Sequence, residues 1–333
     1  MRSEKTNIQQ TKLKSISNTA KLLLLLFLGL SLVNCRNNPE SVWAQQPGLY
    51  PEGLERHPQK NSFIVTSLSN GSAGLVNDKG EYSAFIQDER LISAIGIRVD
   101  KKNDRVIIAN SDPGVSVRTS PETKNKLAAV GIYSLKDGSP ISYYELHKLY
   151  KGNHFANDID VDKDGNIYVT DSFSPVIYKI DTTGKESVFF THERFTGKGF
   201  NLNGIAVFNN YLVVAKYNEG ILFKIPLENP ENFSQVQIDR TFPGADGLVV
   251  AKDGSLTVIA NKSTQTVFKL ESEDDFVSAR VIATDNYKWR FNTTGVFRCG
   301  DLYVLNAELG SLFDAKEPVQ KFEIRKVNFK DIK

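Results

Sequence analysis

Residues 156–172, ANDIDVDKDGNIYVTDS, decide the fold class of this chain. They contain two short runs of alternating apolar and polar side chains, joined by the turn-forming triplet Lys163-Asp164-Gly165. Such alternation is typical of a half-buried β-strand, and Asp-Gly is a favoured hairpin turn. A third run, VIYKIDTT, follows at residues 176–183. The stretch therefore predicts three successive strands joined by tight turns.

The same three-strand pattern occurs six times beyond residue 50. Its first strand appears as PEGLERHPQ, AIGIRVDKK, ANDIDVDKD, LNGIAVFNN, ADGLVVAKD and TTGVFRCG. The copies align at roughly 43 to 62 residue intervals, which are typical of propeller blades. We therefore expect an all-β, six-bladed β-propeller over residues 49–333, and a β-sandwich would not account for six copies. The longest interval holds the polar residues 111–129, expected to form an inserted surface loop. The aligned positions are Gly53, Gly96, Asp158, Gly204, Gly247 and Gly295.

One position of the repeat carries the candidate chemistry. In a propeller the first strand of each blade lines the central channel, so the residue before each aligned position lies at the channel mouth. Four of these six side chains are carboxylates or amides, and two carry charge. Such oxygen ligands suit Ca²⁺, with Mg²⁺, Mn²⁺ or Zn²⁺ as alternatives. The six residues are Glu52, Ile95, Asn157, Asn203, Asp246 and Thr294.

A turn is the alternative explanation for these residues, because Asn-Gly and Asp-Gly are favoured turn dipeptides. The hairpin turns are predicted elsewhere, however, at 77–80, 163–165 and 252–254. The candidate residues lead directly into apolar strands at the same phase of the repeat. A shared metal site is therefore the interpretation that the spacing favours.

These residues resemble a known family. PEG at residue 51, ANDIDVDKDGNIYVTDS at 156, LNGIAV at 202 and ADGLVV at 245 are similar to the group of senescence marker protein, gluconolactonase and luciferin-regenerating enzyme, with paraoxonases as more distant relatives. The resemblance covers about residues 49–310. It implies a six-bladed propeller with a catalytic divalent metal on Glu52, Asn157, Asn203 and Asp246. It also implies hydrolysis of lactones or esters, with Asp246 as both metal ligand and general base.

The chain departs from this pattern at two candidate substrate contacts. Phe155 stands where sugar-lactone members carry an arginine, which indicates a substrate more apolar than an aldonolactone. Ile95 stands where paraoxonases carry a histidine, which argues against a histidine dyad. Together with Thr294, these residues are predicted to contact the substrate.

Two further residues near the predicted site have open roles. His154 enters the third blade three residues before Asn157, and it either contacts the substrate or shuttles a proton, or packs at the rim. Asp158 could bind a second, structural metal, as the corresponding aspartate does in paraoxonases, although Gly53 replaces a carboxylate of such a site. Tyr168 and Asp171 are expected to serve packing and strand-end hydrogen bonds.

The N-terminus predicts export. Residues 1–21 are basic, and the apolar run LLLLLFLGLSLV at 22–33 is too short to span a bilayer. We expect a signal peptide over residues 1–35 with lipidation at Cys35, or instead cleavage after Ala44. Residues 36–48 are expected to be a flexible tether. The product would be a periplasmic or cell-envelope lipoprotein, or a secreted protein.

Composition limits the remaining partners. A formal net charge of +2, part of it in the leader, gives no reason to expect a nucleic-acid partner. The two cysteines exclude a disulfide framework. Cys299 is expected to be a lone thiol if Cys35 is lipidated, and a bridge between the two is the alternative. We expect a monomer that binds a small lactone or ester, with a lipid on Cys35 as its membrane tether.

Three functions remain open from the sequence. The first is an exported, divalent-metal-dependent hydrolase of lactones or related esters. The second is a non-enzymatic propeller in which the metal is structural and the loops bind a ligand, because a fold does not fix a function. The third is a propeller like strictosidine synthase that works without metal, and the retention of all four ligand positions argues against it.

Overall fold

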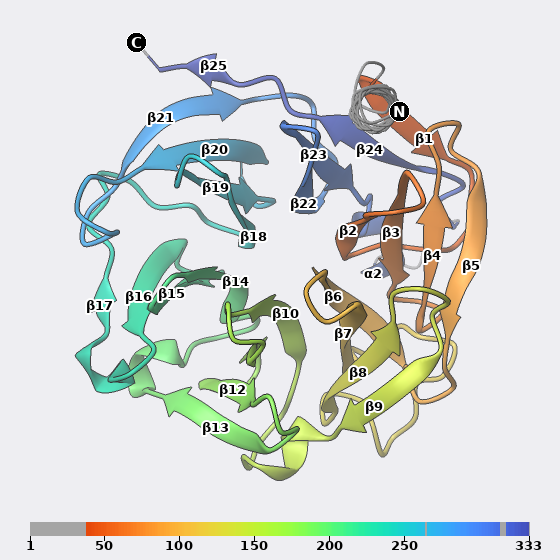
Figure 1. Ribbon diagram of the computed structural model, residues 1–333, viewed down its shortest axis with the longest axis horizontal. Helices are drawn as coiled ribbons and strands as arrows, with labels where there is room; N and C mark the ends of the chain where they lie inside the picture. The colour runs from red at the N-terminus through yellow and green to blue at the C-terminus, as the bar shows by residue number, and fades with distance from the viewer. Residues whose placement is uncertain (1–37, 264, 314–317, 333) are drawn as a thin grey trace, which may run out of the picture. The chain divides into compact units, whose positions relative to one another are not determined.

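The computed structural model describes residues 38–263, 265–313 and 318–332. In these residues the strands form six antiparallel sheets around a common centre (Figure 1). Residues 40–333 form one compact unit. The six-bladed β-propeller predicted from the repeat is therefore confirmed.

Blades one to four each contain four strands in chain order from the centre outward. The first strand of each blade lies nearest the centre in Figure 1. The strands are β2 (Leu54–His57), β3 (Ser62–Ser67), β4 (Ser72–Val76) and β5 (Tyr82–Gln87); β6 (Ser93–Asp100), β7 (Arg105–Ser111), β8 (Ala128–Ser134) and β9 (Pro140–Tyr144); β10 (Ala156–Val161), β11 (Ile167–Asp171), β12 (Val176–Ile180) and β13 (Glu186–Thr191); and β14 (Leu202–Phe208), β15 (Tyr211–Lys216), β16 (Ile221–Pro226) and β17 (Ser234–Gln235).

Blades five and six include strands from the ends of the described chain. Blade five adds β25 at its outer edge, and blade six takes its outermost strand, β1, from the N-terminal side. Their strands are β18 (Ala245–Val250), β19 (Leu256–Ala260), β20 (Thr266–Glu271), β21 (Arg280–Asp285) and β25 (Lys330–Asp331), and β22 (Asn292–Arg298), β23 (Asp301–Asn306), β24 (Phe322–Lys326) and β1 (Ser41–Ala44).

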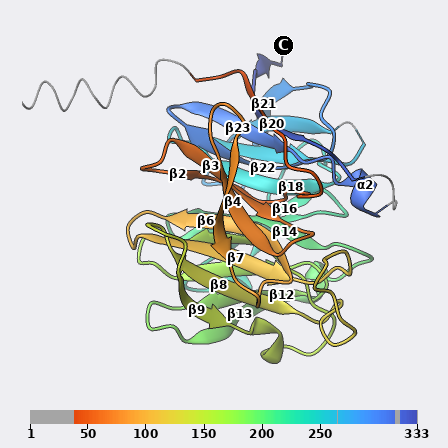
Figure 2. The same cartoon turned by 90° about the vertical axis from the view of Figure 1, so that its right-hand side faces the viewer.

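Short helical turns complete the described elements. Figure 2 shows the ring from the side, with α2 at one of its faces. Among the described residues, no helix has the length and apolar character needed to cross a membrane. The turns are η1 (Leu146–Lys148), η2 (Glu193–Phe195), η3 (Pro230–Asn232) and α2 (Gly310–Phe313).

The turn between β10 and β11 shows why the sequence forms hairpins where it does. Asp162 Oδ1 accepts hydrogen bonds from the backbone N–H groups of Asp164, Gly165 and Asn166 at 2.9–3.0 Å. Gly165 has a φ of +102°, a conformation that costs glycine little. The side-chain acceptor and the glycine together fix the reversal predicted at this triplet.

The aligned glycines let neighbouring blades approach each other near the centre. A Cβ on Gly96 would collide with the carbonyl oxygen of Asn157 in the next blade, and a Cβ on Gly204 would collide with that of Asp246. The glycine of the repeat therefore leaves room for the backbone of the following candidate ligand. Gly53 makes the same kind of close approach to the carbonyl oxygen of Ile95, so this contact accounts for the glycine in three of the six copies.

The predicted tether at residues 36–48 is wrong in its central part. Ser41–Ala44 forms β1, which pairs antiparallel with β24, and the side chains of Val42 and Ala44 are buried. The alternation of these four residues fits a strand with one buried face, and β24 would otherwise present an unpaired edge. The first and last parts of the propeller sequence thus share one blade and close the ring.

Other N-terminal predictions fall outside the described residues. The signal peptide at residues 1–35 and the lipidation site Cys35 lie there and stay predictions. Cys299 follows β22 and is disulfide-bonded. The expectation of a lone thiol at Cys299 is therefore wrong.

Candidate functional site

A β-bulge places the candidate ligands at the centre of the propeller. In β10 the register with β11 moves from Ala156 opposite Asp171 to Ile159 opposite Val169, so Asn157 and Asp158 share one partner position. Equivalent shifts occur at the same place in β6, β14, β18 and β22. A bulge bends the strand and turns a side chain away from the regular alternation. We call the residue before each aligned position of the repeat, at the channel mouth, the ring position. The bulge therefore directs the side chain at the ring position into the channel.

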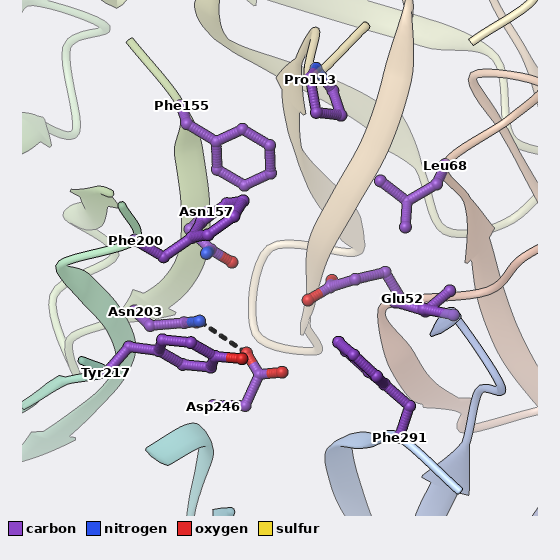
Figure 3. A pocket seen from close by; sticks show the side chains of 11 residues that line it. Glu52, Leu68, Pro113, Phe155, Asn157, Phe200, Asn203, Tyr217, Asp246 and Phe291 are labelled. Carbon is purple, nitrogen blue, oxygen red and sulfur yellow. Dashed lines mark hydrogen bonds between the residues drawn. The ribbon is translucent and has the colours of Figure 1, made fainter. Parts of the chain in front are cut away.

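Four of the six ring residues converge on one space. Figure 3 shows the side chains of Glu52, Asn157, Asn203 and Asp246 directed toward a common point. They come from the segment before β2 and from β10, β14 and β18, four blades in all. The structure thus brings together the residues that the sequence predicted as metal ligands.

The amide of Asn157 is held with its oxygen toward this space. Its Nδ2 donates to Ser172 Oγ at 2.9 Å, and Ser172 Oγ donates to the carbonyl oxygen of Leu202 at 2.5 Å. The opposite atom, Asn157 Oδ1, is buried and has no hydrogen-bond partner. Figure 3 shows this oxygen facing Glu52 and Asp246. A buried acceptor without a partner costs free energy, which a cation ligand would recover.

Both carboxylate oxygens of Asp246 accept a hydrogen bond from an asparagine side chain. Asn203 Nδ2 donates to Oδ1 at 2.6 Å, and Asn261 Nδ2 donates to Oδ2. Tyr217 Oη in turn donates to Asn261 Oδ1 at 2.8 Å. These bonds restrict the orientation of Asp246 without adding a positive charge.

The acidic groups at the centre disfavour each other's ionised forms. Burial and the nearby Asp158 raise the pKa of Asp246 to about 8, although hydrogen bonds from Asn203 and Asn261 oppose the rise. Burial, followed by repulsion from Asp246 and Asp158, raises the pKa of Glu52 well above its usual range. A divalent cation between Glu52 and Asp246 would favour the ionised form of both.

The donor set fits a hard divalent cation. Glu52 and Asp246 supply two charges, and Asn157 Oδ1 faces the site without another partner. Asn203 presents its NH₂ group to Asp246 here, and a half turn of that amide would present Oδ1 instead. In the described part of the chain, no three His, Cys, Asp or Glu side chains form a metal-binding group by themselves. The site therefore depends on the two asparagines.

An apolar pocket opens beside the four candidate ligands. Its wall includes the aromatic rings of Phe155, Phe200, Tyr217 and Phe291, which Figure 3 labels. Phe155 and Phe200 pack edge to face at 5.1 Å, and both contact Phe173. The remaining apolar lining residues are Leu68, Pro113 and Leu309.

His154 does not line this pocket. It is buried, with Nδ1 2.8 Å from Asp171 Oδ2 and Nε2 3.0 Å from the carbonyl oxygen of Tyr150. Tyr178 Oη donates to the same Asp171 oxygen at 3.3 Å. Both ring nitrogens of His154 are engaged, so the structure gives it a packing role. Asp171 also accepts the backbone N–H of Phe155 at 2.9 Å, and so helps to fix that ring in the pocket.

The other ring positions lie apart from the apolar pocket. Ile95 is fully buried in the hydrophobic core and does not reach it. Thr294 and Asp158 line a smaller cavity, whose wall also includes Glu52 and Asp246. Burial raises the pKa of Asp158 to about 7, and its Oδ2 accepts the backbone N–H of Ile205 at 3.3 Å. Asp158 thus connects blade three to blade four.

A second position of the repeat contributes to the site and was missed from the sequence. The residue directly after the second strand of a blade points inward in four blades. Ser172 and Asn261 hold candidate ligands, while Leu68 and Tyr217 line the pocket. The aligned second strands, such as IYVTDS, contain this signal, because the residue after each strand has a fixed offset from the ring position.

Comparisons with known proteins agree with the fold. No family model matches the chain. Over 196 residues, 59% of the chain, it is 26% identical to the protein strictosidine synthase-like 3 of Arabidopsis thaliana. That match covers 38% of the relative, so the chain spans well under half of its length.

Solved structures match nearly the whole chain. Mala s 1, the major allergen of Malassezia sympodialis, has a TM-score of 0.70 at 16% identity, covering 88% of this chain and 97% of that one. The fold is that of the gluconolactonase-like propellers. Regucalcin, a calcium-binding protein of Agrobacterium tumefaciens, has a TM-score of 0.59 at 14% identity and covers 87% and 94% of the two chains. A gluconolactonase of Xanthomonas campestris has a TM-score of 0.57 at 13% identity and covers 85% and 88%. The resemblance predicted from the sequence is confirmed at the level of the fold.

Proposed function

We propose that this protein is a divalent-metal-dependent hydrolase of apolar lactones or related esters. The observation that carries the proposal is the unpartnered, buried Asn157 Oδ1, which faces two carboxylates at the floor of an aromatic pocket. Glu52, Asn157, Asn203 and Asp246 would hold the cation, with Ca²⁺ favoured by their oxygen ligands. When bound there, a divalent cation polarises the substrate carbonyl and stabilises the negative charge that develops on its oxygen.

Asp246 is the proposed general base. Its carboxylate is oriented by Asn203 and Asn261, so one face is fixed toward the pocket. In its ionised form it takes a proton from the water that attacks the carbonyl carbon. The products are the hydroxy acid from a lactone, or an acid and an alcohol from an ester.

The pocket wall favours an apolar substrate. Phe155 and Phe200 form a rigid edge-to-face pair beside Asn157, and Tyr217 and Phe291 complete the aromatic lining. Burial of an acyl chain or an aryl group against these rings is favourable by roughly 25 cal/mol per Å². A polyhydroxylated sugar lactone would lose hydrogen bonds to water without gaining polar partners from these side chains.

A second candidate function is a metal-free propeller of the strictosidine-synthase-like kind. The partial sequence match favours it, as does the direct hydrogen bond between Asn203 and Asp246, which satisfies both residues without a cation. In this candidate the four central residues bind or orient an organic ligand themselves.

One experiment distinguishes the two. The purified protein and Asp246→Asn are assayed on γ-lactones and aryl esters after chelation and after re-addition of Ca²⁺, Mn²⁺, Mg²⁺ or Zn²⁺. Turnover that is lost on chelation and restored by one metal in the wild type alone supports the hydrolase. Turnover unaffected by chelation, or no turnover and no metal-dependent rise in melting temperature, rejects the metal-dependent hydrolase.

We also propose that the chain is exported and processed upstream of β1. Cleavage after Ala44 would remove the strand that completes blade six, so a processing site nearer residue 35 is the one compatible with the closed ring. Mass spectrometry of the mature N-terminus tests this, because a first residue at 45 or beyond would contradict it.

A further inference from the structure

Residues 112–127 form an insert between β7 and β8, and one residue of this insert reaches the pocket. The corresponding connection in blade one has four residues, from Leu68 to Gly71. The sequence predicted a surface loop here. The structure instead places Pro113 in the pocket lining, between Phe155 and Leu68 (Figure 3).

The insert is attached to blade one by its side chains. Arg118 Nη1 donates to the carbonyl oxygens of Asn70, Gly71 and Leu91 at 2.6, 3.0 and 2.8 Å. Ser116 Oγ lies within hydrogen-bond distance of the carbonyl oxygen of Ser69, at 3.1 Å, and of that of Ile92. Hydrogen bonds from a charged guanidinium are stronger than those between neutral groups. The middle of the insert is therefore fixed to its neighbour rather than free in solvent.

The insert also has an internal anchor beside Pro113. The buried carboxylate of Asp112 accepts hydrogen bonds from Thr119 Oγ1 and Thr123 Oγ1, both at 2.7 Å, and from the backbone N–H of Gly114 at 2.8 Å. These contacts lie immediately before and after Pro113, whose own ring fixes its φ angle. The position of the proline ring is thus determined from both sides.

The far end of the insert is attached to blade three. The carbonyl oxygen of Asn125 accepts the backbone N–H of His154 at 2.9 Å, next to Phe155. The insert therefore runs across blade two and joins the two sides of the pocket. Since Phe155, Phe200 and Phe173 also pack on one another, the aromatic wall next to Pro113 is equally constrained.

We propose that Pro113 sets the size of the acyl or aryl group that the pocket accepts. The inference rests on the proposed function of the same site. Both walls are built from mutually packed or hydrogen-bonded groups, so the pocket is preformed and cannot widen without breaking the Arg118 contacts. Lactones with long or branched side chains are then limited by contact with the proline ring, and short-chain lactones are not.

The test compares two prolines of the same insert. Pro113→Ala enlarges the pocket, while Pro121→Ala changes an exposed proline away from it. Both are assayed with γ-valerolactone and γ-dodecalactone in the metal that supports turnover. We expect the ratio of kcat/KM for the long over the short lactone to rise on the order of ten-fold in Pro113→Ala and to stay unchanged in Pro121→Ala. An equal ratio in both variants and wild type would overturn the proposal.

A second variant tests the rigid wall without relying on turnover. Arg118→Met removes three hydrogen bonds and keeps the aliphatic stem. We expect faster amide hydrogen exchange at residues 113–127 and weaker discrimination between the two hydroxy acid products, measured by calorimetry. Unchanged exchange and unchanged discrimination would contradict the fixed wall. If the wild type hydrolyses no lactone but binds these acids, the proposed function is rejected. The size limit is then tested by the calorimetric comparison of the two acids alone.

Discussion

Asn261 donates its side-chain amide to Oδ2 of Asp246, and the two residues sit at matching ends of neighbouring strands, β18 and β19. The bond links the inner strand of blade five to the residue after its second strand. Because Tyr217 also donates to Asn261, a single amide connects the candidate base to the pocket wall. Asn261 is thus a positioning residue, and we expect its loss to weaken both the proposed metal site and the fold.

Asn261→Ala removes this connection. Asp246 Oδ2 and the Tyr217 hydroxyl both lose their partner, and we expect a loss of about 1–3 kcal/mol in the free energy of unfolding. Removal of an outer partner of a metal ligand costs roughly 10- to 100-fold in affinity. Thermal shift titration with Ca²⁺ measures both effects. Tyr217→Phe, which removes the hydroxyl alone, is the control, and an identical Ca²⁺ response in Asn261→Ala and wild type would show that the amide does not position the site.

Asp246→Asn should abolish the stabilisation of the fold by the metal. The amide has the same shape and removes a buried acid whose pKa is raised to about 8. We expect its melting temperature without metal to equal or exceed that of the wild type, while the rise on adding Ca²⁺ disappears. Hydrolysis should fall at least 100-fold. Scanning fluorimetry with and without Ca²⁺ measures the first effect, and the same Ca²⁺-induced rise in both proteins would remove Asp246 from the ligand set.

Val42→Asp tests closure of the ring by β1. Val42 is 1% exposed and pairs with Ile324, so a carboxylate there is buried without a partner. We expect a loss of more than about 3 kcal/mol in the free energy of unfolding. Ser41→Asp introduces the same charge on the half-exposed side of the strand and should cost less than about 1 kcal/mol. Urea denaturation of both variants checks this, and a loss in Val42→Asp as small as that in Ser41→Asp would mean that β1 contributes little to stability.

His57 should make stability depend on pH. It is fully buried, with Nε2 donating to the carbonyl oxygen of Leu135 at 2.9 Å and Nδ1 accepting from the N–H groups of Gln59 and Lys60 at 3.2 Å. Burial lowers the pKa of His57 below its usual range, so the unfolded chain binds the proton more readily. This contribution to stability is complete above about pH 6.5 and is lost as the pH falls below it. His57→Gln should show a flatter decline between about pH 7.5 and 5.5, and an unchanged slope would assign the decline to other groups.

The strands and the ring positions could be predicted because the repeat fixes both. Each copy carries the same alternation, and five of the six carry the same glycine, so alignment alone placed Asn157, Asn203 and Asp246 at equivalent positions. The bulges could not be foreseen, yet they preserve the alignment because they occur at the same place in five blades.

The pocket wall and the ring closure could not be predicted. Phe200 and Phe291 come from loops whose paths depend on contacts such as Asn201 Nδ2 with the carbonyl oxygens of Gly197 and Gly199. The role of β1 depends on a partner, β24, at the other end of the chain, and four residues with one buried face carry too little pattern to identify a strand. His154 remained open for the same reason, since its partner Asp171 is set by the packing of blade three.

The pairing of β1 with β24 has a consequence for how the molecule is made. These strands are separated by about 280 residues, so the sixth sheet is completed after nearly the whole chain has been synthesised. Contacts this distant in sequence carry a high entropic cost of loop closure and slow the approach to the native state. Until β24 is in place, β1 remains an apolar segment without a docking partner. Closure of the sixth blade is therefore expected to be a late step of folding, and the other five sheets can form before it.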